Sequence, residues 1–522
     1  MHQSWENEFR DRLPLSNTLI AAGLLVVMTI LGGRFFVTST PADAPVVESG
    51  RLTVADWNFN RGTIQLSGDW EFYWKQYLGE DRLPPRQQPD YGRVPNVWHN
   101  FEIDAVQQDL GDDDTARGYA TYRLIIDDLE PGPYSIFIPI LYAPSRIWVD
   151  GEQLTENGKL ARDFNAGEEA IWKGHFAGFN TDDSDIEILI EVSDHIHGDG
   201  RFIVPPVFGP PDAISDYITV FNIRDLLIQG IATVLFIFGV VLFLFRRSDF
   251  ASLYFAIFAL SFGTVLSYLG VSLPEVLMPG LDFWTKINIF YAAECAAVIS
   301  AAAYIAALYP DERIRIVDRL IQIITVFFLI YVTIILAGKP DPFDFPQYAV
   351  FLTVIIPFSS LYILVTVIRA ALNNRDGAWI FLFSMLILIY CSIGEIFVTN
   401  GTLPTIPAIG LGLGMTSLGF MIFLIAQVIV LAQRWTHTLQ TSEKMTTDLS
   451  RLIEVTSAIS SEMRLETLLG RIVHGATEFI HAERSTLFLY DERTDELWSL
   501  IAERLENRGI RMPANQGLAD AC

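Results

Sequence analysis

The chain has 522 residues, of which 51% are hydrophobic, and it carries 61 Asp and Glu against 36 Lys and Arg. So high an apolar content is typical of a membrane protein that carries soluble domains, and the length predicts about three domains. The net charge of −25 excludes nucleic acid as an expected partner, because phosphate binding requires clustered Lys and Arg. Three dispersed Cys give neither a disulfide framework nor a zinc pattern, so no metal and no cofactor is expected in this fragment.

The first apolar segment covers residues 18–33 and is preceded by Arg10 and Arg12. Residues 1–44 are therefore predicted to be a cytoplasmic N-terminus with an uncleaved signal anchor, or a signal peptide with a small-residue cleavage site at 42–44. The short apolar run and the distant cleavage site favour the anchor. In both alternatives the segment that follows is exported.

Residues 45–218 are predicted to form an exported all-β sensor domain. Short runs rich in β-branched and aromatic residues alternate with Asp, Gly and Pro turns, which at this spacing indicates a sandwich or a jelly roll. The expected strands lie in 121–127, 134–140, 145–154 and 185–192. Asp150–Gly151 is expected at the turn of a hairpin.

Seven apolar segments follow within residues 219–434, and they predict a seven-helix transmembrane bundle, since roughly 20 apolar residues cross a bilayer as a helix. The expected spans are about 226–245, 251–272, 287–308, 319–337, 348–369, 378–398 and 408–432. Arg246, Arg313 and Arg375 fall in alternate loops, whereas the loop 272–283 has no Lys or Arg. The positive-inside rule then places the β domain outside and the C-terminus inside.

Two carboxylates lie within the predicted spans, Glu294 in the third and Glu395 near the end of the sixth. A carboxylate inside a membrane is costly and often functional, so a transporter or channel is an alternative function. The structural alternatives are that Glu395 lies at the outer interface and that Glu294 pairs with a polar neighbour. No inverted repeat supports a transporter.

Four segments of the β domain resemble the galactose-binding-like jelly roll, which occurs in many glycosidases and outside many bacterial receptors. They are LSGDWEFYW (66–74), VPNVWHNF (94–101), GYATYRL (118–124) and RIWVDGEQLTENG (146–158). The resemblance implies that Trp70, Phe72, Trp98 and Trp148 pack in the core and that a ligand meets the loops.

The segment DHIHGDGR (194–201) is the candidate ligand loop. His195 and His197 alternate as on a strand, yet no third ligand has a fixed spacing, so no metal site is predicted. A small molecule or carbohydrate is the expected ligand, and a module that only contacts a partner protein is the alternative. The candidate ligand-binding residues are Trp98, His99, Asp194, His195, His197 and Arg201.

The stretches RRSDFASLYFAIFAL (246–260) and AALYPDER (306–313) resemble the bacterial seven-transmembrane receptors with diverse intracellular signalling modules (7TM-DISM). With the β domain in front, the resemblance covers roughly residues 50–435. It implies a multi-pass receptor of the bacterial inner membrane, with a periplasmic or extracellular ectodomain and a cytoplasmic C-terminus. It does not name the ligand.

Residues 435–464 are predicted to form a coiled-coil signalling helix. Six residues follow 4-3 spacing and define the seam, which is Met445, Leu449, Leu452, Thr456, Ile459 and Met463. This pattern indicates a short parallel coiled coil, so a homodimer is expected. The alternative is that the stripe packs on its own domain.

Residues 465–522 resemble the opening of a GAF domain, with a helix at 465–480, strands at 485–490 and 497–502, and the segment IRMPANQGLAD at 510–520. A GAF domain needs roughly 70 further residues, so an incomplete domain is expected. No catalytic residues are predicted, because the chain has no phosphate loop, HExxH or nucleophile elbow.

Several functions remain open at this point. The first is a receptor that relays an extracytoplasmic signal to a GAF-linked output. The GAF opening also resembles those that precede class III nucleotide cyclases, so the chain is alternatively the regulatory half of an adenylate cyclase, or of a histidine kinase, diguanylate cyclase or phosphatase. A transporter and an adhesion module without signalling are the others.

Overall fold

The computed structural model describes residues 44–514 apart from several gaps. The gaps are 82–87, 111–115, 140, 142, 164–166, 170, 173, 197–199, 201, 203, 271–277, 279, 338–353, 400–413, 462–464, 483–484 and 500–509. The predicted anchor at 18–33 therefore lies outside the described residues. The chain divides into two compact units, Met1–Leu431 and Ala432–Cys522.

Two sheets build the β region. The larger has the order β4-β3-β5-β10-β7-β8, with β1 parallel to β5, and the smaller has the order β2-β11-β6-β9. The larger sheet contains β1 (Arg51–Thr53), β3 (Gly68–Trp74), β4 (Asp90–Val94), β5 (Gly118–Asp127), β7 (Ser145–Val149), β8 (Glu152–Asn157) and β10 (Ile186–Asp194). The smaller contains β2 (Ile64–Gln65), β6 (Gly132–Ile138), β9 (His175–Thr181) and β11 (Val207–Gly209).

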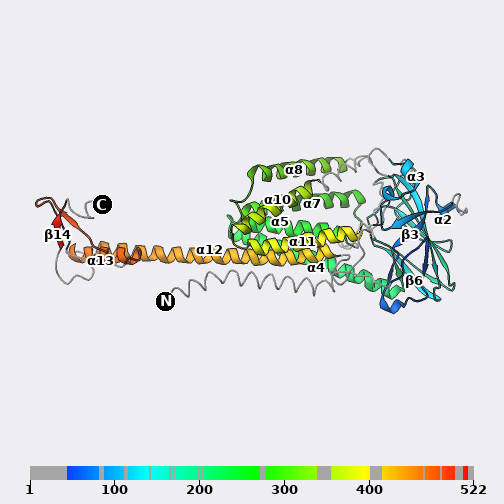
Figure 1. The fold of residues 1–522 in the computed structure, drawn as a ribbon, viewed down its shortest axis with the longest axis horizontal. Coiled ribbons are helices and arrows are strands. Elements are labelled where there is room, and N and C mark those ends of the chain that lie inside the picture. The colour runs from blue at the N-terminus through cyan, green and yellow to red at the C-terminus, as the bar shows by residue number, and fades with distance from the viewer. Residues whose placement is uncertain are drawn as a thin grey trace. The chain divides into compact units, whose positions relative to one another are not determined.

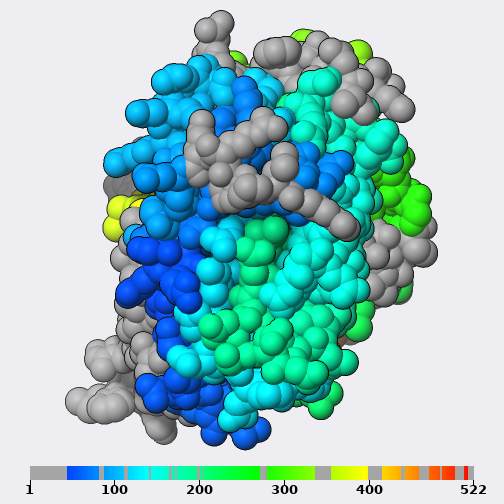
Figure 2. Space-filling model, turned by 90° about the vertical axis from the view of Figure 1, so that its right-hand side faces the viewer, coloured from blue at the N-terminus to red at the C-terminus, as the bar shows by residue number. Residues whose placement is uncertain are grey.

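Short helices lie in the connections between these strands. They are η1 (Phe59–Arg61), α2 (Leu78–Asp81), η2 (Trp98–Asn100) and α3 (Asp104–Gln108). Segments from the start and the end of the β region lie side by side on one face (Figure 2), as the pairing of β2 with β11 requires.

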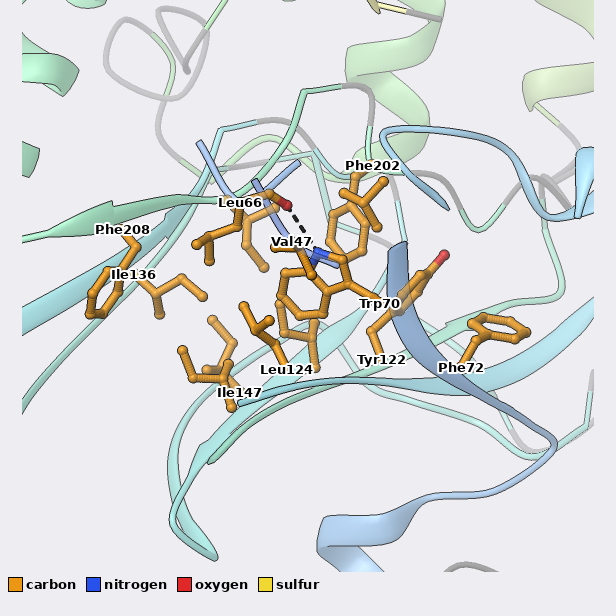
Figure 3. Close-up of a cluster of buried hydrophobic side chains, with 14 of the residues drawn as sticks. Val47, Leu66, Trp70, Phe72, Tyr122, Leu124, Ile136, Ile147, Phe202 and Phe208 are labelled. Carbon is orange, nitrogen blue, oxygen red and sulfur yellow. Dashed lines mark hydrogen bonds between the residues drawn. The ribbon is translucent and has the colours of Figure 1, made fainter. Parts of the chain in front are cut away.

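One hydrophobic core draws side chains from both sheets. Trp70 and Tyr122 of the larger sheet meet Ile136 and Phe208 of the smaller in a single cluster (Figure 3). The indole Nε1 of Trp70 donates a hydrogen bond of 2.9 Å to the carbonyl oxygen of Leu66, so the polar atom of this fully buried ring is satisfied. Two sheets that share one core form a β-sandwich. The prediction that this region is rich in β structure is thus confirmed, and the jelly-roll topology stays a prediction.

The predicted hairpin is present as β7 and β8, which pair in antiparallel register. Asp150 and Gly151 connect them with φ angles of 47° and 76°. Two successive positive φ values are the requirement of a type I′ turn, and Asp-Gly is a preferred sequence for it. The local turn chemistry therefore identified this hairpin correctly.

A bundle of apolar helices follows the β region (Figure 1). The helices are α4 (Pro211–Phe245), α5 (Phe250–Tyr268), α7 (Phe283–Leu308), α8 (Arg315–Ala337), α10 (Ile356–Leu372), α11 (Ala378–Thr399) and α12 (Met415–Ser461). Six of them are long and apolar enough to cross a membrane, whereas α10 is a shorter apolar helix of 17 residues. Because residues 338–353 before α10 are not described, the seventh span stays a prediction.

Helix α4 begins at Pro211, well before the predicted span at 226. The early turns carry Asp212 and Asp216, so they lack the continuous apolar signal by which a span is predicted. Their apolar face packs instead on the β region, where Ile214 and Phe221 join a cluster with Phe137, Val204 and Val207. The same helix therefore contacts the sandwich and continues into the bundle.

The second unit contains the end of α12, then α13 (Leu465–Phe479) and a three-stranded antiparallel sheet. Its strands, in the order β12-β13-β14, are β12 (Leu489–Asp491), β13 (Glu496–Ser499) and β14 (Ile510–Pro513). The predicted helix is present, and the predicted strand at 485–490 is shorter and shifted to 489–491. Membership of the GAF fold stays a prediction.

Candidate functional site

The predicted ligand loop begins at the buried end of β10. Asp194 is 3% exposed, and its Oδ2 accepts a hydrogen bond of 2.9 Å from the backbone N of Gly200. His195 is 7% exposed, and its Nε2 lies 3.3 Å from the carbonyl oxygen of Ala161, to which it donates. Both side chains are thus bonded within the fold. His197 and Arg201 lie outside the described residues.

Trp98 lies at the start of η2 with no exposed surface. Its Nε1 donates a hydrogen bond of 2.7 Å to the hydroxyl of Tyr122, which in turn donates to the carbonyl oxygen of Gly200 at 3.2 Å. Gly200 approaches the indole so closely that a Cβ at this position does not fit. This burial favours the packing role that the jelly-roll resemblance implies for Trp98. His99, beside it, is half-buried.

Glu168 is a residue that the sequence did not single out. Its carboxylate accepts the backbone N–H of His195, with Oε1 at 3.3 Å and Oε2 at 3.1 Å. Burial and the neighbouring Asp194 carboxylate raise the pKa of Glu168 to about 8. In the sequence, Glu168 and Glu169 are typical of a solvated acidic pair. The fold places the carboxylate of Glu168 at the end of β10.

The two loops of this site contact the membrane helices. Trp172 donates from Nε1 to the carbonyl oxygen of Tyr268 at 3.1 Å, and its ring centroid lies 5.3 Å from that of Tyr268 and 5.5 Å from that of Phe290. Ile196 is 8% exposed and packs in a cluster of residues from α7 and α8, namely Phe283, Ile287, Tyr291 and Val332. The sequence had no signal for this junction, because it joins segments about 100 residues apart.

A chain of buried polar groups links three helices inside the bundle. Tyr304 of α7 donates to Oε1 of Gln427 in α12 at 3.1 Å, and Nε2 of Gln427 donates to Oγ of Ser384 in α11 at 3.3 Å. All three residues are at most 1% exposed. Hydrogen bonds between apolar helices hold them in register, so α12 is fixed to both α7 and α11.

Glu395 binds the N-terminus of α12. Its Oε1 accepts from the backbone N of Gly414 at 2.7 Å, and its Oε2 accepts from the backbone N of Thr416 at 2.8 Å. A carboxylate at this place satisfies two free N–H groups and complements the helix dipole. The carboxylate predicted as a candidate for ion transport thus has a structural partner, which the sequence could not show because the cap comes from another helix.

Replacing Glu395 with Ala is expected to lower the free energy of unfolding by about 1 kcal/mol, the usual cost of a lost N-cap. Thermal unfolding of the purified chain in detergent measures the change. Glu395→Gln is the matched control and is expected to lose less, because one amide oxygen still accepts a bond. An unchanged melting temperature for Glu395→Ala would refute the capping role.

Glu294 has no such partner in the part of the chain that the structure describes. Its Oε2 is buried without a hydrogen bond, so the predicted pairing with a polar neighbour is not found there. Cys295 and Cys391 are free cysteines, and both are buried in their helices.

An ion-pair cluster joins the loop after α7 to the loop before α11. Arg375 donates from Nε to Oε1 of Glu312 at 2.6 Å and from Nη2 to Oδ2 of Asp311 at 2.8 Å. Burial opposes ionisation of Glu312, yet the hydrogen bond and charge of Arg375 lower its pKa overall. In the sequence, Arg375 contributed only to the predicted orientation of the spans. In the structure its side chain also connects the loop after α7 to the loop before α11.

The described residues contain no group of three or more His, Cys, Asp or Glu that could hold a metal ion. The six apolar helices and the two N-terminal sheets define a multi-pass membrane protein with an N-terminal β region. Residues 221–434 match the family described as 7TM diverse intracellular signalling. Together with the six apolar helices, this match indicates that the helical region of the chain is similar to that family of membrane signalling proteins.

Solved structures show only a weak likeness. A β-glucuronidase of Ruminococcus gnavus is 14% identical over 25% of this chain and 21% of its own, with a TM-score of 0.19. A GH2 β-galacturonidase from Eisenbergiella tayi bound to galacturonate is 12% identical over 28% of this chain and 24% of its own, with a TM-score of 0.20. The chain thus spans about a quarter of these structures, and such scores decide neither fold nor ligand. The comparison with curated proteins finds no match.

Proposed function

We propose that this protein is a signal receptor of the bacterial inner membrane. Its β region senses a small extracytoplasmic ligand, with a carbohydrate as the candidate, and the helices relay the signal to a GAF-linked output in the cytoplasm. The family match supports a membrane signalling receptor. The output enzyme, for which a class III adenylate cyclase is the candidate, is part of the same proposal.

The observation that carries the proposal is the continuity of α12. This helix runs unbroken from Met415 to Ser461, from the bundle core into the second unit. Phe420 and Gln427 have no exposed surface, whereas Met445 is 70% and Leu449 56% exposed. One continuous helix therefore carries both the buried polar chain of the bundle and an exposed apolar stripe further along the sequence.

The exposed stripe is the predicted seam of a coiled coil. Leu452 is 41% exposed and Thr456 is exposed as well, while the Ile459 side chain and Met463 lie outside the described part. Burial of apolar side chains at heptad spacing against a second helix lowers the free energy. A second copy of this chain supplies such a helix with its apolar residues in matching positions. Ligand binding outside would shift α12 and so reorient the two copies, with a coupling free energy of about 1–3 kcal/mol.

Cysteine cross-linking in membrane vesicles tests this proposal. In a chain whose three native cysteines are replaced by serine, Leu449→Cys and Leu452→Cys are expected to form cross-links between copies several-fold faster than Thr447→Cys. Thr447 lies on the same helix but off the seam, so it is the matched control. Addition of a ligand from a panel of sugars is expected to change the ratio of the seam cross-links.

Two results would count against the receptor. Equal cross-linking at residues 447, 449 and 452 would refute the parallel seam. A seam that cross-links identically with and without a sugar shown to bind the chain would refute the relay from outside to inside.

A further inference from the structure

The outer face of the larger sheet carries a buried carboxylate, that of Glu191 in β10, which has no exposed surface. The short helix α2 lies over it. We propose that Glu191, Trp148 and Arg146 form a binding site for a neutral polyhydroxylated ligand such as a sugar, and that α2 closes this site by occupying the ligand's place. The inference rests on the proposed function, because it gives the extracytoplasmic ligand its site.

The strand register places all three side chains on one face of the sheet. Glu191 pairs with Arg146 of β7, and Trp148 follows two residues later on the same strand. Because side chains alternate along a strand, these three point away from the core, to which Ile147 and Ile190 belong. The jelly-roll resemblance implied a core position for Trp148, and the register places its indole on the outer face instead.

Helix α2 makes the contacts that a sugar ring would make. The backbone N–H groups of Gly79 and Glu80 donate to Oε1 of Glu191 at 2.9 and 3.1 Å. A Cβ at Gly79 would lie 2.5–2.6 Å from Cδ2, Cε2 and Nε1 of Trp148, and the bond between these two carbons is shared by both indole rings, so Gly79 covers the ring face. Adjacent hydroxyl groups and the C–H face of a sugar offer the same two donors and the same apolar contact.

The other oxygen of Glu191 is held by the sheet itself. Its Oε2 accepts from Nε1 of Trp148 at 2.9 Å and from Nη1 of Arg146 at 3.4 Å. Arg146 also pairs with the more exposed Glu156 at 3.2 Å. Because the buried carboxylate already has a cationic partner within the sheet, a ligand that replaces α2 needs to supply hydrogen-bond donors and no charge.

Exposed ion pairs hold the far end of α2. Arg162 contacts Asp81 at 2.7 Å and Glu80 at 3.3 Å, and these side chains are between 30% and 48% exposed. Ion pairs with so much exposed surface contribute little to stability. The contacts that tie the end of α2 to the rest of the β region are therefore weak ones.

The near end of α2 is fixed more firmly. Tyr77, immediately before the helix, is 2% exposed, and its hydroxyl donates to the carbonyl oxygen of Ala161 at 3.0 Å. The backbone N of Leu78 donates to Oγ1 of Thr121 at 3.2 Å. Residues 79–81 therefore have a fixed point from which to swing away from Glu191, and they stay closed until a ligand replaces their contacts.

Gly79→Ala tests the closure, because the added Cβ overlaps the indole face. In the full chain in nanodiscs, mass spectrometry measures hydrogen exchange of residues 76–81, and calorimetry measures binding of glucose, galactose, mannose, xylose, maltose and cellobiose. Exchange and the apparent affinity for the bound sugar are expected to rise by the same factor, about tenfold, since both follow the open population. Gly209→Ala is the matched control, because the nearest atom to its Cβ lies 3.5 Å away, and neither quantity is expected to change.

Two further variants separate opening from binding. Arg162→Ala removes the exposed ion pairs of α2 and leaves Glu191 intact, so it is expected to raise both exchange and affinity a few-fold. Glu191→Gln places an amide NH₂ against backbone or indole N–H donors. It is expected to raise the exchange of α2 without raising the affinity for any of the sugars.

In the wild-type chain a saturating sugar is expected to raise the exchange of residues 79–81, because it displaces them. Unchanged exchange in both Gly79→Ala and Arg162→Ala would overturn the closure, and raised exchange without tighter binding of any of the sugars would overturn the site. A sugar that binds the wild-type chain without raising this exchange would also overturn the site, while sensing by the β region would stand. None of these readouts involves α12, so they are separate from the seam cross-linking.

Discussion

Replacing Trp98 with Ala is expected to lower the free energy of unfolding of the β region by about 3–5 kcal/mol, the usual cost of deleting a large buried aromatic side chain. The indole has no exposed surface, and its ring centroid lies 4.9 Å from that of Trp74 and 6.3 Å from that of Phe72. The substitution also removes the donor to the Tyr122 hydroxyl. Denaturant dependence of amide exchange in β5 and β10, in the full chain, measures the loss.

Tyr91→Ala is the control for this experiment, because Tyr91 is an aromatic residue of β4 in the larger sheet, with 47% of its surface exposed. Its replacement is expected to change the stability by no more than about 0.5 kcal/mol. The comparison separates the two roles predicted for Trp98. Equal stability of the two variants, with sugar binding lost only in Trp98→Ala, would show that the indole contacts ligand.

Features with a local cause were predictable from the sequence. The hairpin at Asp150–Gly151 was predictable because its turn requires two positive φ values, which Asp-Gly readily adopts. Strands β5 and β10 were predictable because their sequences are rich in β-branched and aromatic residues. The apolar helices follow from composition alone, since the bilayer demands long apolar runs. These signals lie within a few residues or within a single element, so no knowledge of the fold is needed.

The site residues depend on contacts between distant segments, and the sequence shows none of these. Glu168 looks like half of a solvated acidic pair until the fold places it beside Asp194. Glu395 looks like a costly membrane charge until the N-terminus of α12 is seen to bind it. Trp98 shows the converse, because an aromatic residue beside a histidine fits a binding surface as well as a core. Burial decides between these alternatives, and it is a property of the whole fold.

The start of α4 was missed for a related reason. A span is predicted where apolar residues run without charges, so Arg224 and Asp225 set the predicted boundary at 226. In the structure the two side chains form a buried ion pair, with Nη2 of Arg224 at 3.0 Å from Oδ1 of Asp225. The guanidinium also lies over the ring of Phe221, with its Cζ 4.3 Å from the centroid. The helix therefore continues through the charges, because they are paired and packed.

Removing the cation of this pair is expected to have an effect as large as that of Trp98→Ala. Arg224 and Asp225 are 5% and 2% exposed, so Arg224→Ala deprives a buried carboxylate of its guanidinium. Breaking such a pair costs about 3–5 kcal/mol, and thermal unfolding in nanodiscs is expected to show a corresponding loss. Arg224→Lys, which keeps the charge but not the two bonds that Nε and Nη2 donate to Oδ1 of Asp225, is expected to lie between wild type and Ala.

The double variant Arg224→Met with Asp225→Leu decides whether the pair stabilises the helix or only tolerates its position. Removal of both charges also removes the desolvation cost of each, so the double variant is expected to regain most of the stability that Arg224→Ala loses. A double variant as unstable as the single one would show that Asp225 is needed for its own contacts, including its close approach to Gly270 at the end of α5. A single variant with wild-type stability would show instead that water reaches the carboxylate, contrary to its burial in the structure.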